Sequence, residues 1–131
     1  GLGDVYKRQE LRFTNPTMPE DMVAYWDFDA PGIPNEPKDA SAAAVMACAM
    51  YELSMYNPEK AALYKKWADT IVESLSKNYR AQLDGDRGFL LLHSTGAHNF
   101  ERDVPLVYAD YYFLEALLKK AKLEKEGTAI L

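Results

Sequence analysis

Apolar residues cover almost every side of the predicted helix from Ala40 to Met55. Glu52 is the only charged residue in this stretch. Because a helix that is apolar nearly all round is buried on both sides, we expect this helix in the interior of the fold. Asp39 stands at the N-cap position, where its carboxylate can accept hydrogen bonds from the free N–H groups of the first turn, and Ser41 is the competing cap.

A second helix is predicted from Asn57, as N-cap, to about Lys77, with Pro58 as its first residue. Its apolar residues recur every four positions while lysines and acidic residues occupy the other sides, so one face is expected to meet solvent. The apolar stripe comprises Leu63, Trp67, Ile71 and Leu75. Only a few residues separate it from the first helix, so the two are expected to form an antiparallel hairpin.

A third helix is predicted to be capped by Asp103 or a near neighbour, with Pro105 in its first turn. Its apolar face comprises Leu106, Ala109, Phe113, Ala116 and Leu117. We expect the chain to fray from Glu124 onward. Asp110 lies among tyrosines on this helix, and we expect its carboxylate to accept a hydrogen bond from a tyrosine hydroxyl.

Two polar loops join these helices. The first, residues 25–39, carries prolines at positions 31, 34 and 37, which stiffen it. Trp26 precedes these prolines. Asp27 and Asp29 beside it are typical of side chains that tie down backbone N–H groups, and the alternatives are that they line an active site or act directly in catalysis. The second loop follows an apolar run at residues 89–92, which we expect to be extended, and its polar tip reads His93, Ser94, Thr95 and Gly96.

Composition narrows the possible partners. The 131 residues carry a net charge of −5, so no basic surface for nucleic acid or an anionic membrane is expected. No apolar stretch approaches the ~18 residues of a membrane-spanning helix. His93 and His98, without a neighbouring Cys or acidic cluster, are a weak metal signal, and we predict no metal and no cofactor. The single cysteine, Cys48, is expected to be a small buried hydrophobe.

The first nine residues differ in character from the rest. Residues 4–9, DVYKRQ, have neither hydrophobic periodicity nor a helix cap, and they are similar to the translated end of a transposon used in preparing sequencing libraries. We interpret residues 1–9 as a sequencing or cloning scar and expect the natural sequence to begin near Glu10. The alternative is a mobile native terminus.

Two long motifs, YWDFDAPGIPNEPKDASAAA and LLHSTGAHNFERDVPLVYADYYFLEALL, resemble the C-terminal part of unsaturated glucuronyl hydrolases, glycoside hydrolase family 88. The resemblance runs in register from about Met18 to Leu123. It implies an all-α fold, part of an (α/α)6 barrel with about three main helices plus rim loops. Because the chain is too short for six helical hairpins, residues 10–131 are expected to be a C-terminal fragment of one barrel catalytic domain.

The resemblance also implies a substrate and a reaction. The family acts on oligosaccharides that end in an unsaturated uronic acid left by a polysaccharide lyase, products handled in a bacterial periplasm or cytoplasm. A carboxylic acid protonates C4 of the C4=C5 bond, water adds at C5, and the resulting hemiketal rearranges with loss of the glycosidic bond. The catalytic aspartates lie before the region matched here, so we assign no catalytic residue to this chain and expect it to be inactive alone.

Four residues are candidates for substrate binding. Trp26 offers a flat apolar face on which a sugar ring can stack, or it packs within its own loop. His93, Ser94 and Thr95 can contact sugar hydroxyls or a carboxylate, or they close the loop with hydrogen bonds. Some family members bind sulfate here through a serine, serine, lysine arrangement. Ser94 is present, but Ala97 and Asn99 stand at the following positions, so we do not expect sulfate binding by that arrangement.

Two alternatives stay open. The hairpin of residues 40–77 can instead present a protein-binding face, as a non-catalytic helical interaction module. A nearer alternative is the unsaturated rhamnogalacturonyl hydrolase family, which shares the chemistry and the barrel.

Overall fold

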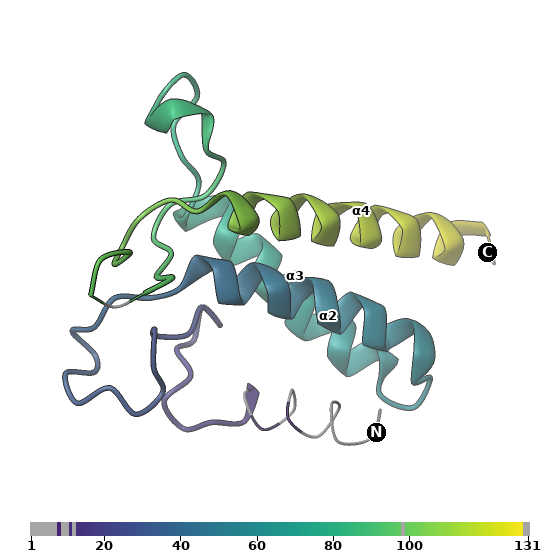
Figure 1. Cartoon of the computed structure of the whole chain (residues 1–131). Coiled ribbons are helices and arrows are strands. Elements are labelled where there is room, and N and C mark those ends of the chain that lie inside the picture. Colours follow the sequence, from purple (N-terminus) through teal and green to yellow (C-terminus); the bar gives the residue numbers. More distant parts are fainter. Residues whose placement is uncertain (1–7, 9–10, 12, 98, 130–131) are drawn as a thin grey trace.

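The computed structural model describes residues 8, 11, 13–97 and 99–129, and its main elements are three α-helices (Figure 1). These are α2 (Ala40–Tyr56), α3 (Ala61–Asn78) and α4 (Val107–Ala129), with one 3-10 turn, η1 (Asp86–Gly88). The described ranges contain isolated antiparallel bridges but no β-strand. The prediction of an all-α chain with about three main helices is confirmed.

α2 is the central helix, as its apolar pattern predicted. It contacts both α3 and α4, whereas α3 and α4 touch each other at few points. In Figure 1, α4 runs alongside α2 and α3 crosses behind it. Ala43, Ala44 and Ala47 on α2 have no exposed surface, and their small side chains let the neighbouring helices approach closely.

The buried core lies along both sides of α2. Cys48 belongs to it, as expected. Among the largest fully buried side chains are Met50, Tyr51, Tyr64, Ile71, Leu75, Leu91 and Phe113. The helices are therefore held mainly by removal of apolar surface from water, at roughly 25 cal/mol per Å² buried.

α3 begins later than the sequence predicted. Its first residue is Ala61, and residues 58–60 form a turn. The Asn57 side chain nevertheless accepts a hydrogen bond from the backbone N–H of Lys60, at 3.3 Å, so it closes this turn instead of capping the helix. Of the predicted apolar stripe, Ile71 and Leu75 are buried, whereas Leu63 is 41% exposed.

α4 also departs from prediction at both ends. Val104 exchanges backbone hydrogen bonds with Ser94, at 2.8 and 2.9 Å, which holds it in extended conformation. The following Pro105 favours that conformation too, so the helix begins only at Val107 and Asp103 is not its cap. The expected fraying from Glu124 is wrong, because the helix continues to Ala129. The predicted buried face is confirmed at Ala109, Phe113 and Ala116.

Two further predictions concern the N-terminal residues and membrane-spanning helices. The proposed scar at residues 1–9 lies, apart from residue 8, outside the described residues, as does the expected start at Glu10. Among the described helices, none combines the length and the apolar character that a bilayer crossing requires.

Candidate functional site

A cleft of about 380 Å³ opens where residues 24–28 meet the first turns of α2. Its lining combines aromatic, acidic and small apolar side chains: Ala24, Tyr25, Trp26, Asp27, Phe28, Asp39, Ala42 and Met46. A concave surface with a few polar groups on an apolar wall is the usual form of a small-molecule site. Trp26, predicted as a binding residue, is in this lining.

Asp39 joins the cleft to the polar loop at residues 93–95. Its carboxylate caps α2, as predicted, by accepting hydrogen bonds from the Ser41 backbone N–H at 3.0 Å and the Ser41 hydroxyl at 2.6 Å. The same oxygen, Oδ1, accepts from the backbone N–H of Thr95 at 3.2 Å. Next to it, the N–H of Ala40 donates to the carbonyl of His93 at 3.0 Å. The start of α2 therefore organises both loops.

Trp26 is fixed in orientation by a contact that the sequence did not reveal. Its indole Nε1–H donates to Oε2 of Glu36 at 2.8 Å, and its backbone N–H donates to the carbonyl of Pro37 at 3.0 Å. Both partners come from the proline-rich stretch at residues 31–38, which we call the connector and which folds back on Trp26. The stiffness predicted for this loop thus serves to place one aromatic ring at the cleft.

His93, Ser94 and Thr95 close their loop, and none of them lines the cleft. Thr95 is buried and its hydroxyl donates to the carbonyl of Lys38 at 3.1 Å. Ser94 is fully buried, and its hydroxyl has no hydrogen-bond partner in the described part of the chain. A direct contact of either side chain with a sugar therefore requires this loop to open.

His93 differs from its neighbours because its side chain is about half exposed. Its Nδ1 lies 2.7 Å from Oδ1 of Asp103, and both residues have positive φ, 63° and 54°. The imidazole also meets the ring of Tyr79 edge-on, with centroids 6.0 Å apart. Of the three loop candidates, His93 alone presents its side chain to solvent in this conformation.

A second contact that the sequence did not reveal is made by Asp21. Asp21 accepts from the Lys38 ammonium and from the Tyr79 hydroxyl, both at 2.7 Å. Burial alone raises the pKa of Asp21, but the hydrogen bonds from Lys38 and Tyr79 outweigh it and lower that pKa below its usual value. A carboxylate that stays charged here ties residue 21 to Lys38 of the connector and to Tyr79 at the end of α3.

The two acidic predictions outside this network have different outcomes. Asp27 accepts from the backbone N–H of Asp29 at 2.9 Å, so the expectation of a backbone tie is confirmed for Asp27. The hydrogen bond predicted from a tyrosine hydroxyl to Asp110 is not formed among the described residues. The Asp110 carboxylate accepts from the backbone N–H groups of Leu90 and Leu91, at 2.9 and 3.0 Å, because the extended run 89–92 lies against the start of α4.

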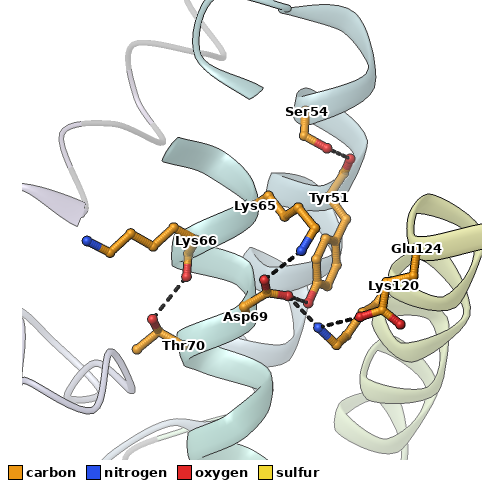
Figure 2. Close-up of polar contacts among 8 residues, drawn as sticks. All are labelled: Tyr51, Ser54, Lys65, Lys66, Asp69, Thr70, Lys120 and Glu124. Carbon is orange, nitrogen blue, oxygen red and sulfur yellow. Dashed lines mark hydrogen bonds and ion pairs between the residues drawn. The ribbon is translucent and has the colours of Figure 1, made fainter. Parts of the chain in front are cut away.

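A separate polar cluster lies between the helices, away from the loops (Figure 2). Asp69 of α3 accepts from the Tyr51 hydroxyl at 2.7 Å and pairs with Lys65 at 2.8 Å and Lys120 at 2.7 Å. Burial raises the pKa of Asp69, yet these donors together lower it to about 2. The cluster joins α2, α3 and α4, and we assign it a structural role.

No metal site is found in the part of the chain that the structure describes, in that no three His, Cys, Asp or Glu side chains there are grouped to hold an ion. His98, the second histidine of the weak metal signal, lies outside the described residues.

The chain is similar to proteins named as unsaturated glucuronyl hydrolases. One from Formosa agariphila is 44% identical over 109 residues, which are 81% of this chain and 27% of that protein. A crystal structure of an unsaturated glucuronyl hydrolase specific for heparin gives a TM-score of 0.84 at 42% identity, covering 88% of this chain and 32% of the other.

A third similar protein was solved with a ligand. It is a variant of the unsaturated glucuronyl hydrolase of Streptococcus agalactiae complexed with dGlcA-GalNAc6S, with a TM-score of 0.78 at 28% identity over 91% of this chain and 33% of that one. No protein-family model matches the chain. The chain thus spans about a quarter to a third of the proteins that it matches.

Proposed function

Because this chain belongs to the unsaturated glucuronyl hydrolases, we propose that it is part of a glycosidase that acts on saccharides ending in an unsaturated uronic acid. The supporting observation is the match in both sequence and three-dimensional structure, with a cleft at the motif that carries the resemblance. The solved relative in complex with dGlcA-GalNAc6S supports a saccharide of this class as the ligand.

In the proposed reaction, a carboxylic acid protonates C4 of the unsaturated uronate. Water then adds at C5, and the hemiketal formed there rearranges so that the bond to the next sugar breaks. This differs from displacement at the anomeric carbon by a pair of carboxylates. The acid has to keep its proton near neutral pH, which requires a raised pKa. No carboxylate of this chain is proposed for that task.

The role proposed for this chain is to bind and orient the saccharide. Trp26 supplies a rigid aromatic face at the cleft, because Glu36 fixes its indole N–H. A sugar ring can stack on that face through its C–H groups. His93 is proposed as a second contact at the exposed loop, and Ser94 and Thr95 as the buried supports that set its position.

Binding is the direct test of this role. Isothermal titration calorimetry of the chain with an unsaturated glucuronyl disaccharide should give saturable binding, weakened about tenfold by Trp26→Ala through loss of aromatic contact. Tyr56→Ala is the matched control, because Tyr56 is an exposed aromatic residue at the opposite end of α2. Absence of binding by the unchanged chain, or equal weakening by both variants, would contradict the proposal.

Catalysis is tested separately. We expect the isolated chain to leave the ultraviolet absorbance of the C4=C5 double bond unchanged, because the acid is proposed to lie outside the matched region. Steady loss of that absorbance, abolished by Asp27→Asn, would show instead that this chain carries the acid. Comparing glycosaminoglycan-derived with pectin-derived disaccharides separates the glucuronyl from the rhamnogalacturonyl alternative.

A further inference from the structure

One carboxylate oxygen connects the cleft with the loop that leads from Thr95 to α4. Oε2 of Glu36 accepts the indole Nε1–H of Trp26 at 2.8 Å and lies 3.8 Å from a guanidinium nitrogen of Arg102. Because both groups contact the same oxygen, Glu36 brings the guanidinium of Arg102 into the neighbourhood of the Trp26 indole. Arg102 belongs to the loop between Thr95 and α4, far along the chain from the connector.

The position of Glu36 is built into the connector. Its other oxygen, Oε1, accepts the backbone N–H of Gly32 at 3.2 Å. A Cβ atom at position 32 would lie 2.5 Å from this oxygen, so glycine lets the carboxylate come this close. The Glu36 side chain is only 14% exposed, which indicates a held group and not a mobile surface acid.

The guanidinium of Arg102, in contrast, remains available to a ligand. The Arg102 side chain is 50% exposed, and its contact with Glu36 is long for an ion pair. Guanidinium has five N–H donors in a planar fork that suits carboxylate and sulfate oxygens. A group placed in this way can donate to an anion on the solvent side while Glu36 holds it from behind.

The cleft is surrounded by acidic side chains, so an acidic ligand needs a cationic group such as the Arg102 guanidinium to bind there. Asp27 and Asp39 line the cleft, and Glu36 accepts the indole N–H of Trp26. Lys38 lies nearby, but its ammonium is engaged by Asp21 at 2.7 Å. An anionic sugar would meet like charges on these walls, which costs free energy unless a cation faces it.

We propose that Arg102 binds an anionic oxygen group of a sugar stacked on Trp26, and that Glu36 is the positioning residue that sets Arg102 beside the ring. This inference rests on the proposed function and names the part of the site that selects acidic saccharides. The anion is either the uronate carboxylate or a sulfate ester on the neighbouring sugar, and the ligands of the test distinguish the two.

The test compares three ligands by calorimetry: an unsaturated disaccharide without sulfate, its sulfated form, and the neutral methyl ester of the unsulfated one. Arg102→Gln should weaken binding of the anionic ligands about tenfold, the loss expected for a charge-assisted hydrogen bond, and leave the ester unchanged. An effect on both acids identifies the carboxylate as the partner, and an effect on the sulfated form alone identifies the sulfate. Arg102→Lys should restore part of the loss.

Arg87→Gln is the matched control, since it removes the same charge from the exposed turn η1. Figure 1 shows this turn projecting away from the connector. If the unchanged chain binds but Arg102→Gln affects all three ligands equally or none of them, the inference falls and the proposed function stands. If the unchanged chain binds none of the ligands, the proposed function falls and the inference with it.

Glu36→Gln tests the positioning role by itself. Glutamine keeps an oxygen that can accept the Trp26 indole N–H, so affinity for the neutral ester should not change. Without the negative charge Arg102 is no longer held, and the ratio of acidic to neutral affinity should fall toward that of Arg102→Gln. Gly32→Ala should lower this ratio too, because it displaces the carboxylate. A rise in the ratio on Glu36→Gln would show that Glu36 repels the anion and would overturn the positioning role.

Discussion

The carboxylate of Asp39 accepts a hydrogen bond from the backbone N–H of Thr95 at 3.2 Å, although the two residues are far apart in sequence. The same oxygen accepts the backbone N–H of Ser41 in the first turn of α2. One side chain thus caps the central helix and anchors the polar loop at residues 93–95. Its removal should affect the stability of both.

We predict that Asp39→Ala lowers the free energy of unfolding by about 2 kcal/mol, from the lost cap and the unpaired Thr95 N–H together. Asp39→Asn keeps an oxygen acceptor, so it should cost about 0.5 kcal/mol or less. Urea unfolding monitored by circular dichroism measures both. Equal losses for the two variants would show that charge, and not hydrogen bonding, is what Asp39 contributes.

The contact between α4 and the extended run 89–92 gives a second prediction. Asp110→Ala leaves two backbone N–H groups without their acceptor and should lower stability by about 2 kcal/mol. Hydrogen exchange at Leu90 and Leu91 should accelerate in this variant more than exchange within α2. Glu126→Ala removes an exposed acid from the same helix and should leave exchange at both amides unchanged.

The polar cluster between the helices predicts a pH dependence. The pKa of Asp69 is about 2 in the folded chain, below the ordinary value of 3.8. A lowered carboxyl pKa contributes stability that is complete above the unfolded pKa and is lost as the pH falls through the folded one. The stability difference between the unchanged chain and Asp69→Asn should therefore be constant above about pH 5 and shrink between about pH 4 and 2. A difference independent of pH would contradict this account.

An exposed apolar stripe on α4 predicts self-association. Val107, Tyr111, Leu114 and Leu118 follow helical spacing on one side of α4 and are 49 to 73% exposed. Unpartnered apolar surface of this kind promotes association. Sedimentation velocity should show concentration-dependent association that Leu114→Glu and Leu118→Glu reduce. Leu83→Glu, at an exposed leucine in the loop before η1, should leave the association unchanged. A chain that stays monomeric at every concentration tested would contradict the prediction.

The sequence predicted what local patterns control. The start of α2 follows from Asp39 and the apolar residues after it, and the sequence predicted both the cap at Asp39 and the first helical residue, Ala40, correctly. Trp26 was predicted to stand at a shaped loop, and it lines the cleft. These features depend on neighbours in sequence, where capping and periodicity act directly.

The errors arise where distant segments meet. The partners of Asp110 are backbone groups about twenty positions earlier, and no residue type signals them. The start of α4 was placed too early because Val104 pairs with Ser94 on the preceding loop. Glu36 was missed as a partner of Trp26 because the fold of the connector, and not its composition, brings them together.

The most direct test of the central claim, that a saccharide with an unsaturated uronate binds at the Trp26 cleft, uses the two tryptophans of the chain. Trp67 stacks on Phe13, with ring centroids 4.7 Å apart, and serves as an internal reference. In a nitrogen-15 NMR titration with an unsaturated glucuronyl disaccharide, the Trp26 indole N–H resonance should shift and saturate while that of Trp67 stays in place. No shift of the Trp26 resonance, or an equal shift of both, would contradict the account.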